Sequence, residues 1–239
     1  MKIIGVMGNS GSGKTTFSNS LSSKKSVGVI HVDDLVGKAK KKYFRAFLQP
    51  KENNSTEQTK NNPKLKAGAK AFFYKNKFSF NLLMKLRSML VIPEIEKQLE
   101  SFKKDGKELV VIDDWVLTTH KKLSKKIDHI YFLERKYLDR RKGYQTRDAL
   151  TTEEVKISDL PYALGLVKIP DNQNVTRISN NDSIEALEAT ALEIYSKYVS
   201  PSFDERYKVE EVIQTFSQAS KSISKIKDYN HFHNKDIEE

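Results

Sequence analysis

The residues best suited to chemistry lie near the N-terminus, in the stretch Gly8-Asn9-Ser10-Gly11-Ser12-Gly13-Lys14-Thr15. This stretch matches the pattern G-x-x-x-x-G-K-[ST], whose backbone N–H groups wrap the phosphates of a nucleotide. Lys14 is predicted to reach the β- and γ-phosphates of ATP and to act in catalysis, and Thr15 is predicted to ligate Mg²⁺. The predicted nucleotide-binding residues of this loop are Gly8, Asn9, Ser10, Gly11, Ser12, Gly13, Lys14, Thr15 and Thr16. The alternative is a glycine-rich turn between a strand and a helix that binds no nucleotide.

Carboxylates follow two apolar runs of the chain and could serve the same nucleotide. Asp33 is predicted to accept the proton of an acceptor hydroxyl and to help hold Mg²⁺, whereas Asp34 suits the cap of a following helix. Asp113 follows the run Leu109–Ile112 in the general form of a Walker B carboxylate, and it is a further predicted Mg²⁺ ligand. An aspartate in the turn after a strand is also common, and His31 is interpreted as structural.

Four of the eight arginines, namely Arg135, Arg140, Arg141 and Arg147, fall in one short stretch. The planar guanidinium group suits bidentate contacts with phosphate. The last three are predicted to close over ATP as a lid that stabilises the transferring phosphoryl group and excludes water. Of these, Arg141 and Arg147 are the predicted catalytic residues. The alternative is a solvated basic helix whose arginines pair with nearby carboxylates.

The elements that must position these groups are predicted from apolar runs and their periodicity. The predicted strands are Lys2–Met7, Val27–Val32, Leu109–Asp113, Ile127–Leu133 and Val175–Ile178. The predicted helices are Thr15–Leu21, Leu35–Phe47, Leu65–Tyr74, Phe78–Phe102, Arg135–Arg147, a short one from the capping box Thr151-x-x-Glu154, Ser183–Tyr198 and Phe203–Ile226. Pro93 is expected to start, kink or interrupt its helix, Leu160–Asn172 to be irregular, and Gln49–Pro63 to be a loop. Alternating strands and helices predict an α/β fold, here a P-loop NTPase fold with a parallel sheet flanked by helices.

The chain is predicted to form one P-loop domain over residues 1–239. Residues 1–42 and 106–198 are assigned to its core. Residues 43–105 are assigned to an inserted helical lobe that binds the acceptor, and 199–239 to a helical extension and tail. The arginine-rich stretch supplies the lid.

The composition favours a folded protein of the cytoplasm. The first residues enter the glycine-rich motif at once, so no export signal is visible, and no apolar run approaches the roughly 20 residues that span a bilayer. Cysteine is absent, which excludes disulfides, a thiolate nucleophile and Cys-ligated zinc. The net charge of +11 allows a nucleic-acid partner, but the lysine clusters are scattered, which favours a solvated surface. No membrane partner is expected.

Four parts of the chain resemble the dephospho-coenzyme A kinases, P-loop enzymes that phosphorylate the ribose 3′-hydroxyl of dephospho-CoA with ATP and Mg²⁺. The similar segments are Ile3–Thr16 with Val29–Asp33 (the P-loop and the D-x-D element), Ile92–Leu99 (a helix of the acceptor lobe), Arg147–Val155 (the lid) and Ile178–Leu187 (the strand-to-helix element near the adenine). The resemblance implies coenzyme A synthesis, with Asp33 as the base and Asn180 beside the nucleotide.

The chain differs from that family at His31, at Ile92 and over Asp114–Leu117, in segments near the acceptor. An alternative is therefore a uridine-kinase-like or nicotinamide-riboside-kinase-like enzyme, because Ile30–Asp34 also resembles the acidic element of those families. A third class is a non-catalytic nucleotide-binding protein whose positive surface contacts nucleic acid. The sequence leaves the oligomeric state open.

Overall fold

The computed structural model describes residues 1–47, 71–148, 151–169 and 174–199, without the side chains of 40–47 and 144–148. The chain divides into two compact units, Met1–Asn181 and Asp182–Glu239. In the described part of the second unit, α9 (Ile184–Tyr198) begins at Ser183, whose hydroxyl accepts a hydrogen bond from the Ala186 N–H at 3.3 Å. The first unit contains the sheet and the candidate site.

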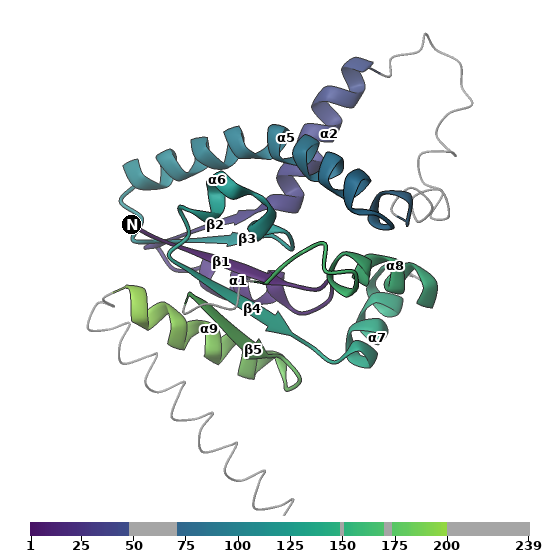
Figure 1. The fold of residues 1–239 in the computed structure, drawn as a ribbon. Coiled ribbons are helices and arrows are strands. Elements are labelled where there is room, and N and C mark those ends of the chain that lie inside the picture. Colours follow the sequence, from purple (N-terminus) through teal and green to yellow (C-terminus); the bar gives the residue numbers. More distant parts are fainter. Residues whose placement is uncertain (48–70, 149–150, 170–173, 200–239) are drawn as a thin grey trace, which may run out of the picture. The chain divides into compact units, whose positions relative to one another are not determined.

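A parallel five-stranded sheet forms the centre of the first unit (Figure 1). Its strands are β1 (Lys2–Gly8), β2 (Val27–His31), β3 (Leu109–Asp113), β4 (His129–Glu134) and β5 (Val175–Ser179). Their order across the sheet is β2-β3-β1-β4-β5, so β1 lies in the middle. Because every neighbouring pair is parallel, the carboxyl ends of all five strands meet at one edge.

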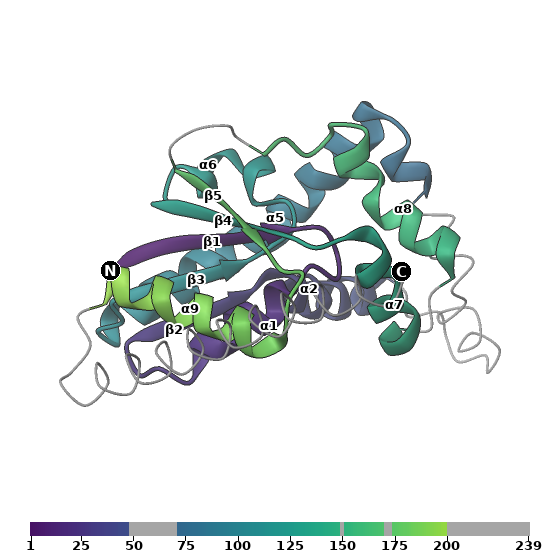
Figure 2. The same cartoon turned by 90° about the horizontal axis from the view of Figure 1, so that it is seen from below.

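The central strands are apolar on both sides because helices cover both faces of the sheet. One face packs on α5 (Lys77–Lys104) and the other on α1 (Lys14–Ser22), as the two perpendicular views show (Figures 1 and 2). An added Cβ at Gly28 of β2 would lie 2.6 Å from the Phe102 ring of α5, which places that helix directly on the strand. On the opposite face, the ring of Phe17 in α1 lies 6.4 Å from that of Tyr131 in β4.

The helix α5 runs without a break through Pro93, so of the three predicted effects of this proline a helix start and an interruption are wrong, and a kink stays a prediction. Apolar residues on both sides of it are buried in the same core, which holds the two halves in one register. These residues are Phe80, Met84, Val91, Ile95 and Leu99. Pro93 has no backbone N–H, so the carbonyl of Met89, four residues earlier, lacks its helical hydrogen bond. Met89 lies on the solvent side of the helix and is 67% exposed, so water can reach that oxygen.

Other boundaries differ by a few residues from the sequence prediction. The helix α2 (Val32–Phe47) begins directly after β2, so Val32 is helical and both following aspartates lie in its first turn, where the helix dipole favours them. The helix α8 (Thr152–Ala163) continues through Pro161, although this segment was expected to be irregular; the Leu164 N–H donates to the Leu160 carbonyl at 2.8 Å. The predicted capping box at Thr151 and Glu154 is confirmed.

The remaining described helices of the first unit are η1 (Leu117–Thr119), α6 (Lys121–Ser124) and α7 (Tyr137–Asp148). The predicted loop at 49–63, most of the predicted helix at 65–74 and the helix at 203–226 lie outside the described residues. The limits of the inserted lobe stay a prediction. In the described part of the chain, no helix has both the length and the apolar character needed to cross a bilayer.

Candidate functional site

The glycine-rich loop joins the carboxyl end of β1 to the first turn of α1. Three of its glycines have positive φ, with values of 147° at Gly8, 74° at Gly11 and 97° at Gly13, a region that side chains disfavour. An added Cβ at Gly8 would lie 2.4 Å from the Leu133 carbonyl oxygen. Only glycine therefore allows the loop to turn this closely against β4, and the turn directs the start of α1 toward the loop's concave side.

Lys14 is the first residue of α1, and its amine lines a cavity in front of the loop. The Nζ atom donates to the Asn9 carbonyl at 3.2 Å. Burial lowers the pKa of Lys14, while the carboxylates of Asp113 and Asp33 act in the opposite direction. A lysine in this position can place its positive charge against a phosphate chain held by the loop.

Thr15 and Asp113 lie side by side, as the sequence predicted for a Mg²⁺ site. The Thr15 hydroxyl donates to the Asp113 Oδ2 atom at 3.2 Å, and His31 Nδ1 lies 3.1 Å from the same oxygen. The other ring nitrogen of His31 lies 3.0 Å from the Asn19 side-chain oxygen. The hydrogen bond to Asp113 raises the pKa of His31. His31 therefore orients the carboxylate from the neighbouring strand.

The donor set fits a Mg²⁺ ion that is shared with a nucleotide. Mg²⁺ prefers oxygen ligands and usually takes one or two from the protein, the rest being phosphate oxygens and water. Thr15 and Asp113 supply a hydroxyl and a carboxylate at the end of the phosphate loop. Within the described ranges there is no group of three or more histidine or acidic residues that could hold a metal by themselves.

Asp33 lies in the first turn of α2, and its side chain is 74% exposed. One of its oxygens accepts a hydrogen bond from Arg87 Nη2 at 2.8 Å. Arg87 comes from α5 and is only 8% exposed, and its Nη1 atom donates to both oxygens of Asp114 at 2.9 and 3.0 Å. A single buried guanidinium thus joins the accessible carboxylate to a fully buried one.

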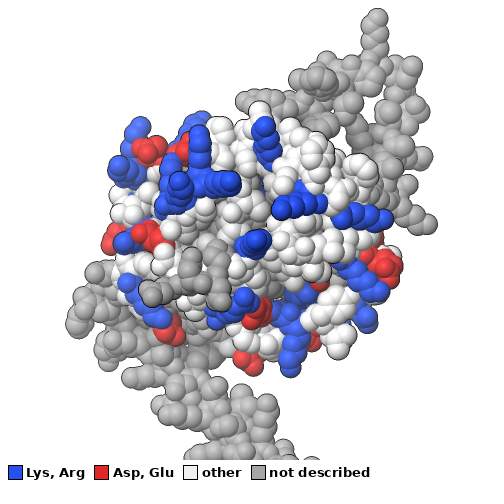
Figure 3. Space-filling view, in the orientation of Figure 1, with Lys and Arg blue, Asp and Glu red and all other residues white. Residues whose placement is uncertain are grey.

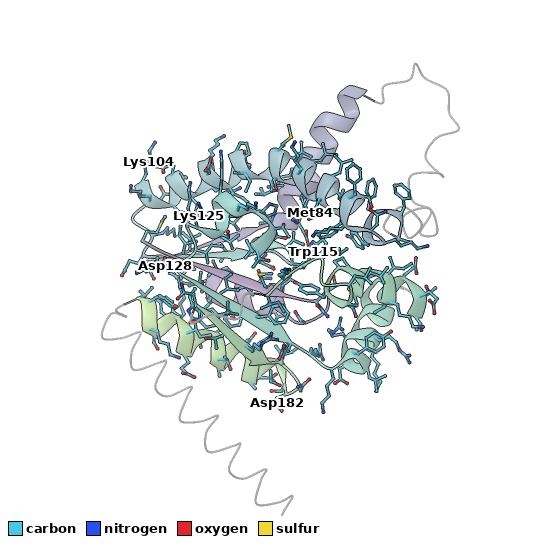
Figure 4. All side chains as sticks on the ribbon, viewed as in Figure 1. Met84, Lys104, Trp115, Lys125, Asp128 and Asp182 are labelled. Atoms are coloured by element: carbon cyan, nitrogen blue, oxygen red, sulfur yellow. The ribbon has the colours of Figure 1, made fainter. Side chains whose placement is uncertain are left out.

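A polar cluster behind Arg87 anchors it. Asp114 is buried, and His120 Nε2 lies 3.3 Å from its Oδ2 atom. The other ring nitrogen of His120 lies 2.5 Å from the Ser88 hydroxyl of α5. Met84 and Trp115 belong to the same core and lie between α5 and the sheet (Figure 4), and the Arg87 guanidinium carbon is 5.9 Å from the Trp115 ring centroid. Sequence analysis missed this cluster.

The glycine-rich loop and the polar residues that follow β2 and β3 line a cavity of about 600 Å³ at the carboxyl edge of the sheet. Its walls are the glycine-rich loop with the start of α1, the polar ends of β2 and β3, and the first turn of α2. Arg135, which precedes α7, and Gly143 within α7 complete the lining. The lining residues are Ser10, Gly11, Gly13, Lys14, Thr15, Thr16, Asn19, His31, Asp33, Asp34, Asp113, Arg135 and Gly143. Six of the predicted loop residues and the carboxylates of Asp33, Asp34 and Asp113 therefore meet in one cavity, whereas Gly8, Asn9 and Ser12 are not among its described lining residues.

The arginines of the predicted lid differ in position. Arg140 is 5% exposed, pairs with Asp159 of α8 through two hydrogen bonds of 2.8 Å, and donates to the Ser10 carbonyl at 3.2 Å. Arg135 lines the cavity, whereas Arg141 is not among the lining residues that the structure describes. The side chain of Arg147 lies outside the described residues. Arg140 therefore fastens α7 and α8 to the phosphate loop.

Asn180, predicted to lie beside the nucleotide, supports the glycine-rich loop through a hydrogen bond to its backbone. Its side-chain amide donates to the Ser12 carbonyl at 2.8 Å, and its backbone N–H donates to the Glu134 carbonyl at 2.7 Å. The residue is 8% exposed. It therefore links the loop to the ends of β4 and β5, where its short polar side chain satisfies a buried carbonyl.

No protein-family model matches the sequence, and no curated protein matches it. The crystal structure of TT1252 from Thermus thermophilus is similar over 83% of this chain and 98% of that chain, with 20% sequence identity and a TM-score of 0.55. Dephospho-CoA kinase from Campylobacter jejuni aligns over 84% of this chain and 98% of its own, with 14% identity and a TM-score of 0.47. Shikimate kinase from Acinetobacter baumannii in complex with shikimate aligns over 85% of this chain and 96% of its own, with 15% identity and a TM-score of 0.47.

The similarity to TT1252 shows a shared fold. The predicted α/β fold, with a parallel sheet flanked by helices, is confirmed by the strand order and by this comparison.

Proposed function

We propose that this protein transfers the γ-phosphate of ATP to a hydroxyl group of a small molecule. The observation that carries the proposal is the meeting, in one cavity, of a phosphate-binding loop, a lysine, a threonine–aspartate pair and an accessible aspartate. Phosphoryl transfer needs these parts and little covalent chemistry from the protein, because positioning and charge neutralisation supply most of the catalysis.

In this proposal the loop residues Gly8–Thr16 bind the phosphates of ATP through backbone N–H groups, and Lys14 neutralises charge on the transferring group. Thr15 and Asp113 hold Mg²⁺, and His31 keeps the Asp113 carboxylate oriented. The bound metal ion supplies positive charge at the phosphate oxygens.

Asp33 is the proposed general base. Its exposed carboxylate can accept the proton of an acceptor hydroxyl, and Arg87 fixes its orientation through the 2.8 Å hydrogen bond. With Arg87 on one of its oxygens, Asp33 serves the acceptor better than the metal. Arg141 and Arg147 stay predictions as catalytic lid residues, and Asn180 supports the nucleotide site through the loop.

For the acceptor we propose dephospho-CoA, phosphorylated on the ribose 3′-hydroxyl in the cytoplasm as a step of coenzyme A synthesis. This finer proposal is supported by the four sequence segments that resemble the dephospho-CoA kinases. The alternative acceptor is a nucleoside such as uridine or nicotinamide riboside, and it is supported by the acidic element that ends in Asp33 and Asp34, both of which line the cavity.

The test is a coupled assay of ADP release with ATP and Mg²⁺, in which dephospho-CoA, uridine, cytidine and nicotinamide riboside are offered separately. We expect Lys14→Ala to lower kcat by about 100-fold or more, since it removes a charge from the transition state. Asp33→Asn is expected to lower kcat by about 100-fold or more with little change in the KM for ATP. Asp34→Asn, the matched neighbour, is expected to keep most of the activity.

Turnover with dephospho-CoA alone would support dephospho-CoA as the acceptor. Turnover with a nucleoside alone would show that the acceptor is a nucleoside instead. ATP binding without any acceptor-dependent ADP release would contradict the kinase proposal. In that case salt-sensitive binding to RNA or DNA would identify a nucleotide-binding protein that uses its net charge of +11.

A further inference from the structure

The helix α8 contacts two separate parts of the first unit from one of its sides. Asp159 and Tyr162 lie three positions apart on this helix, so they share that side. Asp159 binds Arg140 through two hydrogen bonds of 2.8 Å, and Arg140 donates to the Ser10 carbonyl of the glycine-rich loop at 3.2 Å. The Tyr162 hydroxyl donates to the backbone carbonyl of Trp115, in the segment that follows β3. One helix therefore reaches both the glycine-rich loop and the segment after β3.

The outer side of α8 is polar. Glu153 and Lys156 form an ion pair of 2.9 Å there, and their side chains are 75% and 58% exposed. Acidic and basic side chains both reach the surface over α8 (Figure 3). The charged residues of the helix that face water are therefore separate from the side that carries Tyr162, which turns toward the sheet.

The surroundings of Tyr162 hold its ring and keep its hydroxyl protonated. The ring packs edge to face on Phe132 of β4, with the ring centroids 5.8 Å apart. Burial raises the pKa of Tyr162, and the negative charge of Asp114 adds to this rise, whereas a hydrogen bond from the Gly8 backbone acts in the opposite direction. A phenol whose pKa is raised keeps its proton at neutral pH, so Tyr162 stays a hydrogen-bond donor.

The Tyr162 hydroxyl lies where the pairing of two neighbouring strands ends. The paired residues of β1 and β3 run as far as Val6 and Asp113. Two positions further along these strands are Gly8, the first residue of the glycine-rich loop, and Trp115. Because Tyr162 bonds the Trp115 carbonyl and the Gly8 backbone, its hydroxyl links the two chains just beyond the sheet.

We propose that Tyr162 is a positioning residue that fixes the separation between the glycine-rich loop and the segment after β3. This inference rests on the proposed function, because each of the two parts supplies one proposed Mg²⁺ ligand, namely Thr15 and Asp113. These ligands must lie at a fixed separation, since Mg²⁺ demands near-ideal octahedral geometry. Tyr162 is not among the described residues that line the cavity, so it acts through the backbone of its neighbours.

A second contact keeps the C-terminal end of α8 beside the same segment. The Thr118 hydroxyl donates to the Lys168 carbonyl at 2.8 Å, and Val167 is buried in the core. The helix therefore does not depend on the Tyr162 hydroxyl alone to stay in place. Removal of that hydroxyl should loosen the link to Trp115 while the fold persists.

The test is calorimetric titration of the full chain with ATP, once with Mg²⁺ and once with EDTA. Tyr162→Phe removes the hydroxyl and keeps the ring on Phe132. It is expected to raise the Kd for ATP with Mg²⁺ by about 10-fold and to change the Kd in EDTA by less than about 2-fold, because only Mg²⁺ contacts both parts. The matched control is Tyr137→Phe, since the Tyr137 hydroxyl is buried and has no hydrogen-bond partner among the described residues. It is expected to bind like wild type.

Hydrogen exchange tests the link itself without any nucleotide. The segment 114–120, whose hydrogen-bonded amides include Thr119 and His120, should exchange about 10-fold faster in Tyr162→Phe than in wild type and in Tyr137→Phe. A role in stability alone would lower the urea midpoint of Tyr162→Phe and leave the ratio of its two Kd values as in wild type.

Equal exchange in the three proteins, or an unchanged ratio of the Kd values with Mg²⁺ and with EDTA, would overturn the positioning role of Tyr162 and leave the proposed function standing. A wild type that binds no ATP would contradict the proposed function instead. In that case the exchange rates still decide whether the Tyr162 hydroxyl holds the segment after β3.

Discussion

Single charged residues of this site are held by partners that are distant in the sequence. Arg87 is the clearest case, because its buried guanidinium bonds Asp114 with one nitrogen and Asp33 with the other. The carboxylate of Asp114 balances the positive charge of Arg87, which burial would otherwise leave unpaired. The remaining arm of the guanidinium is then fixed in direction, and this direction determines where the Asp33 carboxylate points.

At this scale we predict separate effects on stability and activity. Arg87→Leu leaves Asp114 buried without its main partner, so the free energy of unfolding should fall by about 3–5 kcal/mol. The double variant Arg87→Leu/Asp114→Leu removes both charges and should recover at least half of that loss. Its activity should stay low, because Asp33 has still lost the group that orients it. Urea unfolding and the ADP-release assay measure the two effects.

The control for this prediction is a surface ion pair. Lys126 and Glu96 are paired at 2.8 Å, and both side chains are about half exposed, 48% and 46%. Lys126→Ala should change the free energy of unfolding by less than about 1 kcal/mol. If Arg87→Leu were as mild as this control, the buried pair would not stabilise the fold as inferred.

At the scale of elements, the phosphate loop depends on contact between two strands and a helix. The loop leaves β1 at Gly8, passes against the end of β4, and starts α1 at Lys14. The Asn180 amide supports it from the end of β5, and Arg140 fastens it to α7 and α8. A change in its backbone should therefore alter the proposed nucleotide site as a whole.

We predict that Gly8→Ala weakens ATP binding by about 100-fold or more and lowers the free energy of unfolding by about 1–3 kcal/mol, because the new Cβ would meet a backbone carbonyl and require a positive φ. The matched control is Gly37→Ala in α2, where nothing lies within 4 Å of the added Cβ. It should stabilise the protein by about 0.5–1 kcal/mol. Calorimetric titration with ATP and urea unfolding measure both variants. If Gly8→Ala and Gly37→Ala bound ATP with equal affinity, the close approach of the Leu133 carbonyl would not be the reason for a glycine at position 8.

At the scale of the whole molecule, binding of ATP with Mg²⁺ should increase the thermal stability of the protein. At about 100 times its Kd, ATP with Mg²⁺ should stabilise the fold by about 2.7 kcal/mol. For a chain of 239 residues this corresponds to a rise in Tm of about 5–10 °C. EDTA should reduce the rise, because Thr15 and Asp113 hold Mg²⁺ in the proposed site.

Variants of Thr15 serve as the comparison in this thermal experiment. Thr15→Ser keeps the hydroxyl and should keep the Mg²⁺-dependent part of the rise in Tm, whereas Thr15→Val should lose it. A rise that is the same with EDTA, or the same in both variants, would show that the threonine–aspartate pair holds no metal.

The sequence alone determined the fold class and the phosphate loop. The motif from Gly8 to Thr15 is local, so it is recognised from the spacing of its glycines, lysine and threonine alone, and the nucleotide-binding roles of these residues stay a prediction. Apolar runs such as Leu109–Asp113 predicted buried strands because both faces of a parallel sheet are covered. The capping box at Thr151 is equally local, since its two partners lie three positions apart. The segment around Pro161 was misjudged, and α5 neither starts nor stops at Pro93, because burial of neighbouring apolar residues outweighs the loss of one helical hydrogen bond.

Only the tertiary structure decided which charges pair. The Arg87–Asp33 contact joins residues 54 positions apart, and the His31–Asp113 contact joins residues 82 apart. The choice of Arg140, rather than Arg141, for the contact with the phosphate loop depends on which side of α7 faces that loop. Such pairings follow from the packing of distant elements against a shared sheet. Residue types and spacing predict the groups that the site needs, whereas packing determines which partner restrains each group.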